Sequence, residues 1–582
     1  MTDVKELAKE WLRIDRDEDT RDQIYKLLVQ GKDDELRRRL TPRISFGTAG
    51  LRAGMEAGFA RMNSVTVIQA SQGLAEYLLA KCDNVKHRGV IIGRDARHNS
   101  EKFARLTAAA FVAKGIKVWW LEDPVHTPLV PFGVKELNAA GGIMITASHN
   151  PPQDNGYKVY WENGCQIIPP HDKGIAASIL ENLEPISWDL SVVDENMLVQ
   201  GTLGLVQDAY FRAVAYSADW EGKLKEAPDL PLKFAYTAMH GVGLKYMTAA
   251  LEHLGVAKYM SVVQEQAHPD PDFPSVKFPN PEEKGAMDLA FWSADRHGID
   301  LVLANDPDAD RFAVAQKVDG KWHQFTGNQL GILLASHIMD RYSKPREKLA
   351  MLSSTVSSRM LAAMASKEGF HHEETLTGFK WMGNMALFLD EQGYDSRFAF
   401  EEAIGYMIPG VVHDKDGVAA AATFLTAVLE WQKHGLTPWQ KLQKLYSKYG
   451  HFEDANTYLI SPSPAVTDEV FEHVRSLGSP YPSALGKRKV RKWRDLTKGY
   501  DSSTDDHTPR LPVDADSQMI TCEVDGDVRF TVRGSGTEPK IKFYIEAKGH
   551  SSEAAKKVAN EVLMELLHDW FVPEKFGLKL PA

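Results

Sequence analysis

Three carboxylates stand at alternate positions in the segment Asn305-Asp306-Pro-Asp308-Ala-Asp310-Arg311. Carboxylates this close repel one another, and their oxygens are the ligands that Mg²⁺ prefers. A calcium loop of the EF-hand type is excluded, because it would need Gly at position 311 and Glu at position 317, where this chain has Arg311 and Lys317. We interpret the segment as a site for a hard divalent cation rather than as a solvated acidic turn.

A second polar loop, Thr146-Ala-Ser148-His149-Asn150-Pro-Pro, follows another apolar run. A serine on such a turn is exposed, and the neighbouring His149 could manage its proton. Ten residues further on, Lys158 returns toward the serine. The segment does not fit G-x-S-x-G, so a hydrolase elbow is not supported. Taken alone, it fits an ordinary Ser/Asn-Pro turn equally well.

Near the C-terminus, Arg533-Gly-Ser535-Gly536-Thr537-Glu-Pro-Lys540-Ile-Lys542 follows a predicted strand at 528–532. Small residues expose backbone N–H groups, and hydroxyls and cations surround them, which is typical of an anion cradle. The segment is not a Walker A motif, and without context it also fits a simple Gly-Ser turn.

Two more loops carry groups that could hydrogen-bond sugar hydroxyls. They are Thr377-Gly378-Phe-Lys380-Trp-Met-Gly383 and Glu401-Glu402-Ala403-Ile-Gly405-Tyr406, and each follows a predicted strand. Each motif is weak by itself.

An α/β scaffold positions these loops. In the first block, the pattern predicts strands at 89–93, 116–121 and 142–146 with helices at 99–114 and 129–137 between them. This spacing implies parallel pairing, in which ligands bind at the carboxyl ends of the strands. The same pattern recurs at 232–304, where it predicts a helix near 283–296, and again at 349–400, where it predicts a strand at 349–354 and a helix near 356–367. We therefore expect three related α/β units.

The fold class that we predict is α/β, with three related units of mixed or parallel sheet and a smaller α+β C-terminal domain. The domains are 1–208, which includes an amphipathic helical arm over the first 40 residues, 209–326, 327–450 and 451–582. Five prolines between positions 269 and 281 predict a rigid connector. The basic run 487–494 is interpreted as a solvated strand face, because no aromatic ladder accompanies it.

Composition narrows the function. The 582 residues carry a net charge of −11, which disfavours nucleic acid as the main partner. Three cysteines without C-x-x-C spacing indicate a reducing compartment. The N-terminal residues do not fit a signal peptide, and the most apolar stretch, 418–429, is too short to span a bilayer. We expect a cytoplasmic protein without membrane partners, a buried helix at 418–429, and a monomer or weak dimer.

Taken together and in this order, the loops resemble the α-D-phosphohexomutase superfamily, and most of all its phosphoglucomutase-2/phosphopentomutase subfamily. The motifs TASHNPP, DPDADR, GFKWMG, EEAIGY and RGSGTEPK carry the resemblance, which extends from Phe46-Gly-Thr-Ala-Gly-Leu-Arg52 to Lys542. It implies four domains around a central cleft, sugar phosphates as small-molecule substrates, one Mg²⁺ ion and a priming sugar bisphosphate.

The resemblance also implies a role for each motif residue. Ser148 would be the phosphoserine, and it would hold Mg²⁺ with Asp306, Asp308 and Asp310. His149 and Lys158 would transfer protons, Arg311 would lie near the transferring phosphoryl group, and Arg52 and Lys380 would lie in the cleft. Substrate contacts would come from the following residues: Thr377, Gly378, Lys380, Glu401, Glu402, Arg533, Ser535, Gly536, Thr537 and Lys542.

One departure bears on the substrate. Many glucose-specific relatives have Ser in the sugar loop, as in E-E-S-F-G, where this chain has Ala403. Loss of that hydroxyl removes a hydrogen bond worth about 0.5–1.5 kcal/mol to a hexose. We therefore expect interconversion of ribose or deoxyribose 1-phosphate and 5-phosphate, with glucose 1-phosphate to 6-phosphate as a second activity.

Other functions stay open at this point. One is an enzyme that acts mainly as a phosphoglucomutase. Another is a glucose 1,6-bisphosphate synthase that takes its phosphoryl group from an acyl phosphate, and a third is a phosphosugar-binding scaffold without activity. A Mg-dependent phosphatase with Asp306 as nucleophile explains neither the Ser148 loop nor the Arg533 cradle.

Overall fold

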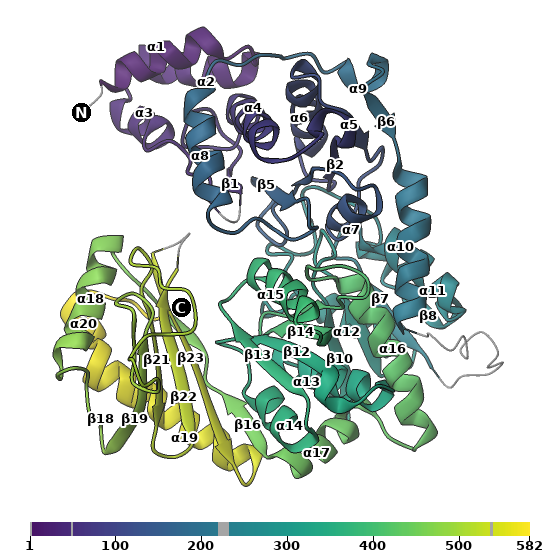
Figure 1. The fold of residues 1–582 in the computed structure, drawn as a ribbon, viewed down its shortest axis with the longest axis vertical. Helices are drawn as coiled ribbons and strands as arrows, with labels where there is room; N and C mark the ends of the chain where they lie inside the picture. Colours follow the sequence, from purple (N-terminus) through teal and green to yellow (C-terminus); the bar gives the residue numbers. More distant parts are fainter. Residues whose placement is uncertain (1–2, 48–49, 219–231, 536–538, 582) are drawn as a thin grey trace. The chain divides into compact units, whose positions relative to one another are not determined.

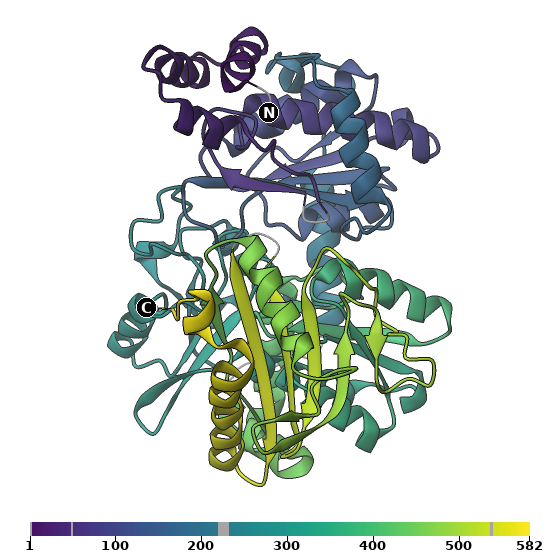
Figure 2. The same ribbon diagram turned by 90° about the vertical axis from the view of Figure 1, so that its left-hand side faces the viewer.

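The computed structural model describes residues 3–47, 50–218, 232–535 and 539–581. The chain forms two compact units, the first made of Met1–Ser343 with Gly378–Pro438 and the second of Lys344–Thr377 with Trp439–Ala582. Figures 1 and 2 show the elements of each unit.

The first unit begins with the predicted helical arm, made of α1 (Val4–Ile14), α2 (Glu18–Val29) and α3 (Asp33–Leu40). Asp3 caps α1 through its side chain. Trp11, fully buried, packs edge-on against Phe59, and the arm shares a small core with Val65 at the start of α4 (Ser64–Lys81). The arm is therefore part of the first domain's packing.

The first sheet has the strand order β1-β5-β4-β2-β3-β6. β2, β3, β4 and β6 pair in parallel, whereas β5 is antiparallel to β4 and β1, so the sheet is mixed. The central strands are buried along their whole length because helices cover them. The elements are β1 (Leu51–Gly54), α5 (Val85–Arg88), β2 (Val90–Arg94), α6 (Ser100–Ala113), β3 (Val118–Trp120), α7 (Leu129–Glu136), β4 (Gly141–Ile145), β5 (Asp154–Trp161), α8 (His171–Glu181), α9 (Val192–Glu195), β6 (Val199–Gly201) and α10 (Leu203–Ala218).

The second sheet has the order β11-β10-β9-β7-β8, with β7 parallel to β8 and β9 and the hairpin β9–β10–β11 antiparallel. The helix predicted from about 283 begins at residue 288, because backbone bonds from Glu283 to Asn280 and from Ala286 to Glu283 form turns before it. The elements are β7 (Phe234–Thr237), α11 (Gly243–Leu254), η1 (Ala257–Tyr259), β8 (Met260–Val262), η2 (Gln264–Gln266), α12 (Asp288–Arg296), β9 (Leu301–Ala304), β10 (Ala313–Val318) and β11 (Lys321–Gln324).

The third block supplies elements to both units. The first unit holds α13 (Gly327–Arg341), α15 (Phe379–Glu391), the antiparallel pair β14 (Asp395–Glu401) and β15 (Gly405–Met407), and α16 (Gly417–Lys433). The second unit holds η3 (Arg346–Lys348), the parallel pair β12 (Leu349–Ser354) and β13 (His371–Thr375), and α14 (Met360–Glu368). The apolar stretch 418–429 is buried within α16, as predicted.

The C-terminal sheet is antiparallel, with the order β16-β23-β22-β21-β19-β18; β17 also pairs with β23, and β20 with β19. Together with its helices it forms the predicted α+β domain. The elements are α17 (Pro438–Tyr449), β16 (His451–Asp454), β17 (Thr457–Ile460), α18 (Pro464–Ser476), β18 (Ala484–Leu485), β19 (Arg488–Asp495), β20 (Tyr500–Asp501), β21 (Met519–Val524), β22 (Val528–Gly534), β23 (Lys540–Gly549), α19 (Ser552–Glu565), the π-helical turn η4 (Leu566–Phe571) and α20 (Pro573–Phe576).

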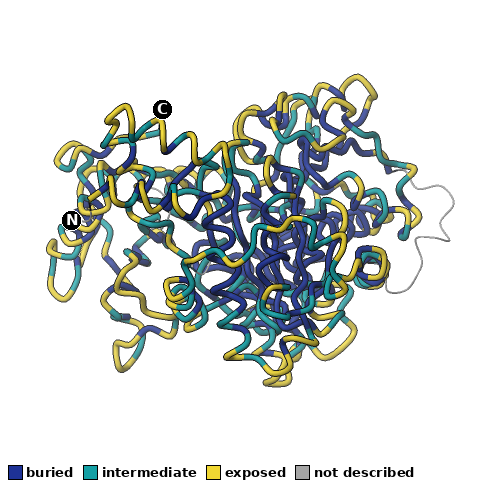
Figure 3. Tube along the Cα trace, turned by 90° about the horizontal axis from the view of Figure 1, so that it is seen from above, coloured by how far each residue is buried: buried dark blue, intermediate teal, exposed yellow. Residues whose placement is uncertain are grey.

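The basic run lies on β19, and acidic partners bind several of its cations. Arg488 pairs with Glu561 and Glu565, and Arg491 pairs with Asp525. These pairs agree with the interpretation of a strand face. Figure 3 colours the chain trace by burial and shows where buried, intermediate and exposed residues lie along it. Among the described residues, no helix combines the length and the apolar character needed to cross a membrane.

Candidate active site

Ser148 lies in the turn that follows β4, at the carboxyl end of the strand. It is 2% exposed, and its Oγ donates to Asp306 Oδ2 at 2.8 Å. Its backbone N–H donates to Thr146 Oγ1 at 2.9 Å, and its φ of +53° is a left-handed conformation that L-residues rarely adopt. Strain of this kind is held in place only by the surrounding contacts and is typical of functional sites.

The three carboxylates form one cluster in the loop after β9. Asp306, Asp308 and Asp310 are fully buried, and each places a ligand oxygen within 4.8 Å of the others. Oδ1 of Asp308 and Oδ1 of Asp310 are buried and accept no hydrogen bond from any described residue. Burial and then the two neighbouring carboxylates raise the pKa of Asp306 well above its usual value. The cluster fits a divalent cation, because a bound cation would supply both the missing contacts and the missing charge.

Two lysines partly balance this charge. Lys158 Nζ donates to Asp308 Oδ2 and to Asp310 Oδ2, both at 2.8 Å, and Lys415 Nζ lies 3.0 Å from Asp310 Oδ2. Burial alone would lower the pKa of Lys158, but the carboxylates of Asp308 and Asp310 outweigh it and raise that pKa. Lys158 is therefore cationic at neutral pH in this structure. Thr127 Oγ1 also donates to Asp308 Oδ2, at 2.6 Å.

His149 and Arg311 flank the serine and the carboxylates. His149 Nδ1 lies 3.4 Å from Ser148 Oγ. Burial, followed by the charges of Arg311 and Arg52, lowers the pKa of His149 well below its usual value, so its imidazole is neutral. Arg311 donates its backbone N–H to Asp306 Oδ1 at 3.0 Å and its Nη1 to the carbonyl of Ala403 at 2.6 Å.

Arg52 reaches the serine loop from β1, where its Nη1 donates to Asn150 Oδ1 at 3.3 Å. Two motif residues beside it, Thr48 and Ala49, lie outside the described part of the chain. The structure thus brings together most of the residues of the first two motifs and Arg52 in one place.

The sugar-loop residues of the first unit lie near one another. Glu401 ends β14 and accepts a hydrogen bond from the backbone N–H of Gly378, and burial followed by the neighbouring Glu402 raises its pKa. Gly378 has a φ of +107°, which a residue with a side chain rarely adopts, and Lys380 follows it in the first turn of α15. Thr377 belongs to the second unit.

The predicted anion cradle lies in the second unit. Arg533 on β22 stands directly opposite Lys542 on β23, and Arg533 Nη2 donates to the Tyr544 hydroxyl at 3.3 Å. Two cations opposite each other on paired strands repel, and an anion placed between them would relieve that repulsion. Ser535 donates its backbone N–H to the Lys540 carbonyl, and Gly536 and Thr537 lie outside the described residues.

Sequence reasoning missed three residues of the first unit. They are Thr127, Lys415 and Arg97, whose guanidinium donates to the Ser148 carbonyl at 2.5 Å. Two sequence features could have indicated two of these residues. Arg97 is one of several polar residues directly after a buried strand. Lys415 lies in the charged run Asp414-Lys415-Asp416, which precedes a glycine and an apolar helix.

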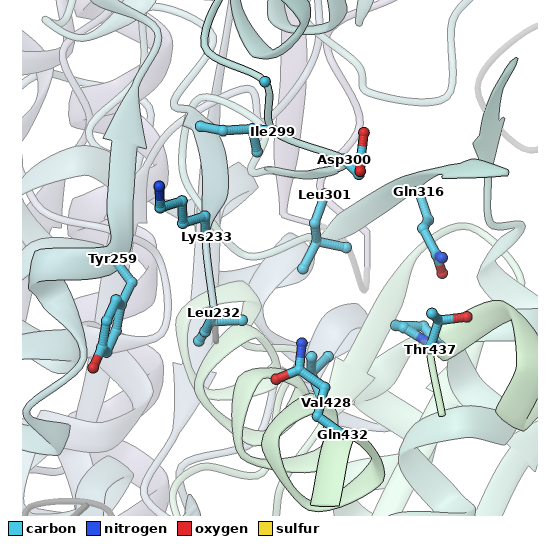
Figure 4. A pocket seen from close by; sticks show the side chains of 12 residues that line it. Leu232, Lys233, Tyr259, Ile299, Asp300, Leu301, Gln316, Val428, Gln432 and Thr437 are labelled. Atoms are coloured by element: carbon cyan, nitrogen blue, oxygen red, sulfur yellow. The ribbon is translucent and has the colours of Figure 1, made fainter. Parts of the chain in front are cut away.

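A separate cavity of about 410 Å³ opens elsewhere in the first unit (Figure 4). It is lined by Leu232 and Lys233 just before β7, by Leu301 at the start of β9 and by Val428 of α16. Leu301 is the first residue of β9, and Asp306 comes shortly after the last residue of that strand. The cavity therefore lies at the amino end of β9, whereas the carboxylate cluster lies at its carboxyl end.

Comparison with known proteins identifies the class. Models of the phosphoglucomutase/phosphomannomutase family match the chain with α/β/α domain I at residues 43–185, domain II at 208–320, domain III at 326–449 and the C-terminal domain at 512–564. The chain belongs to this family, and it is an enzyme, an isomerase-type phosphotransferase.

Curated relatives cover nearly the whole chain. A probable phosphoribomutase of Schizosaccharomyces pombe is 48% identical over 99% of both chains. A human phosphopentomutase is 43% identical over 98% of this chain and 97% of its own. A human glucose 1,6-bisphosphate synthase is 41% identical over 98% of this chain and 94% of its own.

A solved structure shares the fold. It is the open form of a Paramecium phosphoprotein, pp63/parafusin, described as a phosphoglucomutase. The TM-score is 0.70 at 19% identity, with 94% of this chain and 97% of that chain covered. The four-domain α/β class predicted from the sequence is thereby confirmed.

Proposed function

We propose that this enzyme is a Mg²⁺-dependent phosphopentomutase that interconverts ribose or deoxyribose 1-phosphate and 5-phosphate, with glucose 1-phosphate to 6-phosphate as a second activity. The observation that carries the proposal is the Ser148 hydroxyl, held 2.8 Å from Asp306 in a buried cluster of three carboxylates. The names of the curated relatives support the pentose substrate.

Asp306, Asp308 and Asp310 would hold one Mg²⁺ ion together with the phosphate on Ser148. When bound, the ion would neutralise charge on the phosphoryl group. The two buried Oδ1 atoms without a partner support this assignment. Arg311, fixed by Asp306 and Ala403, would add a second positive charge beside the group in transfer.

In the first transfer, the bond between phosphorus and Ser148 Oγ breaks and a bond to a sugar hydroxyl oxygen forms, which gives a sugar bisphosphate. The sugar hydroxyl loses a proton and Ser148 Oγ gains one. We assign these transfers to His149, whose neutral imidazole can accept a proton, and to Lys158, which is held cationic. The bisphosphate then turns over and returns its other phosphate to Ser148, so a priming bisphosphate starts the cycle.

Three loops would recognise the substrate. Glu401, Glu402, Gly378, Lys380 and Thr377 would contact the sugar. The Arg533–Lys542 pair, with Ser535, Gly536 and Thr537, would bind the phosphate that does not react, and Arg52 would help to hold the Ser148 loop. These loops would belong to four domains with the boundaries 208, 326 and 450.

The pentose preference rests on Ala403. Its carbonyl is fixed by Arg311 Nη1 at 2.6 Å, so the loop keeps its place while its side chain offers no hydroxyl. We further propose a cytoplasmic monomer or weak dimer that acts on free sugar phosphates and on neither nucleic acid nor membranes, which the net charge of −11 supports.

The test is kcat/KM for ribose 1-phosphate against glucose 1-phosphate, with Mg²⁺ and a priming bisphosphate. We expect at least a tenfold preference for ribose, about 1.4 kcal/mol of discrimination in the transition state. Ala403→Ser should raise the relative activity on glucose about threefold, through one hydrogen bond. A wild-type preference for glucose would make the enzyme a phosphoglucomutase and refute the argument from Ala403.

The relationship to the glucose 1,6-bisphosphate synthase calls for a second assay. The enzyme is mixed with 1,3-bisphosphoglycerate and glucose 1-phosphate, and bisphosphate formation is measured. We expect this rate to be small beside the mutase rate, and a larger rate would reassign the enzyme as a synthase.

A further inference from the structure

Arg97 holds the backbone of the Ser148 loop. Its side chain is 1% exposed, and its guanidinium donates to the carbonyl oxygens of Ser148 at 2.5 Å, Asn150 at 2.6 Å and Pro151 at 2.9 Å. Asp95 lies 3.3 Å from Arg97 Nε and balances its charge. A planar guanidinium fixes both the place and the direction of the groups it binds. It therefore supports the left-handed conformation at Ser148.

The proline-rich segment 268–281 supplies the other side of Arg97. The Arg97 guanidinium lies over the ring of Phe273, 4.9 Å from its centroid, and Phe273 is only 3% exposed. Phe273 itself has a φ of +46°, which is rare for a bulky residue. His98, next to Arg97, makes a second link at 2.7 Å to Asp272 of the same segment. The segment therefore contacts the holder of the serine loop at two adjacent points.

The same segment is bound to the loop after β7. Its Asp270 donates a backbone N–H to the His240 carbonyl at 2.9 Å, and His240 Nε2 lies 2.7 Å from Ser275 Oγ. Gln266 Nε2 also donates to Ser275 Oγ, at 2.9 Å. These hydrogen bonds hold the segment to the loop after β7, through His240, and to η2, through Gln266.

The loop after β7 packs in turn on the carboxylate loop. Val242 donates its backbone N–H to the Pro307 carbonyl at 2.8 Å. A Cβ added at Gly241 would lie 2.2 Å from Pro307 Cα, so only glycine permits this approach. Pro307 stands between Asp306 and Asp308. A continuous set of contacts therefore joins the serine loop and the carboxylate loop through the proline-rich segment.

We propose that segment 268–281 is a strap that sets the Ser148 loop in register with the Asp306–Asp310 loop. Phe273 within the strap and Arg97, which it contacts, are the positioning residues. Neither residue touches the reacting atoms, and both act through the Ser148 backbone. The proposal rests on the proposed function, because it gives Ser148 the role of nucleophile. It extends the expectation of a rigid connector, since the rigidity serves the geometry of the site.

The test compares Phe273→Leu, Phe273→Tyr and Arg97→Lys with Phe278→Leu, a matched control in the same segment at a position that is 56% exposed. A misplacement of about 1 Å costs on the order of 100-fold in rate. We expect kcat for ribose 1-phosphate to fall about 100-fold in Arg97→Lys and about tenfold in Phe273→Leu, with KM within twofold. Phe273→Tyr keeps the aromatic ring, so its kcat should stay near that of the wild type. The kcat of Phe278→Leu should also equal that of the wild type.

A second measurement separates positioning from general loss of stability. Hydrogen–deuterium exchange should rise in the peptide 146–151 of Phe273→Leu and Arg97→Lys, while peptides of the C-terminal sheet exchange as in the wild type. Wild-type kcat and exchange in both variants would overturn the strap, and so would equal losses in Phe273→Leu and Phe278→Leu. If Ser148→Ala keeps full turnover, the proposed function itself fails, whereas an inactive Ser148→Ala beside an unaffected Arg97→Lys refutes the strap alone.

Discussion

The carboxylate cluster of the first unit and the Arg533–Lys542 pair of the second unit are opposite in charge and in burial. Asp306, Asp308 and Asp310 are fully buried and held by short hydrogen bonds from Ser148, Lys158 and Thr127. Arg533 and Lys542 are half-buried and stand opposite each other on paired strands.

This difference separates two tasks. Buried groups with fixed partners are pre-organised, so they can act on charge that develops during a reaction. Half-buried cations can hold an anion and release it again, which the proposed phosphate-binding loop would need when the proposed bisphosphate intermediate turns over. Changes to the buried cluster should therefore lower kcat, and changes to the cation pair should raise KM.

The largest expected effect is that of Ser148→Ala. Without the hydroxyl the proposed phosphoserine cannot form, so turnover should fall by a factor of about 10⁵ or more, as for other nucleophile deletions. Intact mass after incubation with a sugar bisphosphate should show one added phosphoryl group in the wild type and none in the variant. Ser476→Ala, at an exposed position of α18, is the control and should keep full activity. Turnover without Ser148 would refute the mechanism.

The second effect concerns the metal. Asp308→Asn removes a proposed ligand of Mg²⁺ and disrupts the contacts with Lys158 and Thr127, so kcat should fall about 1,000-fold. Chelation of Mg²⁺ should lower the kcat of the wild type by a similar factor. Since a ligand that binds the native state stabilises it, Mg²⁺ should raise the Tm of the wild type but not of this variant. Asp300→Asn, an exposed carboxylate just before β9, is the matched control. A Tm response to Mg²⁺ that survives in Asp308→Asn would contradict the assignment.

The buried cluster can be predicted from the sequence because its chemistry is local. Asp306, Asp308 and Asp310 stand at alternate positions after an apolar strand, and the structure brings their oxygens within 4.8 Å. Lys415 contacts Asp310 but lies more than 100 positions away from it in the sequence. A periodic pattern of residues cannot predict such a contact. Strap contacts such as Arg97 with Phe273 are equally non-local.

Element boundaries show the same limit. The strand over 349–354 was predicted at its full length, because six buried residues in a row leave a clear signal. The helix after it was predicted from about 356 but begins at Met360, since a backbone bond from Ser357 to Ser354 forms a turn first and the Ser358 hydroxyl binds the Met360 N–H. Local side-chain bonds of this kind compete with the helix, and composition does not reveal which of them forms.

The third effect tests the cation pair. Arg533→Ala removes a charge-assisted contact worth about 1.5–3 kcal/mol, so KM for ribose 1-phosphate should rise about 50-fold while kcat stays within threefold. The rise should shrink at high salt, because ions screen charges that are not buried. Arg510→Ala, an exposed arginine of the same unit, is the control. A loss confined to kcat would contradict the division of tasks between the two regions.

The smallest effect concerns stability beside the buried cluster. His126 precedes Thr127, is fully buried, and stacks on Tyr246 with ring centroids 4.0 Å apart. Neither of its ring nitrogens has a hydrogen-bond partner among the described residues, and burial lowers its pKa to about 3. In the unfolded chain this histidine has a pKa near 6.5 and binds a proton, whereas in the folded state it stays neutral. The free energy of unfolding therefore decreases as the pH falls below about 6.5.

From pH 7 to pH 5 that cost is about 2 kcal/mol for one such histidine. His126→Phe keeps an aromatic ring against Tyr246 and cannot take up a proton, so its free energy of unfolding should fall less than that of the wild type over this range. Urea unfolding at both pH values measures the difference, and His568→Phe, whose side chain is 89% exposed, should behave as the wild type. An identical pH dependence in wild type and His126→Phe would mean that water or a proton reaches this ring and would contradict the burial of an uncharged imidazole beside Thr127.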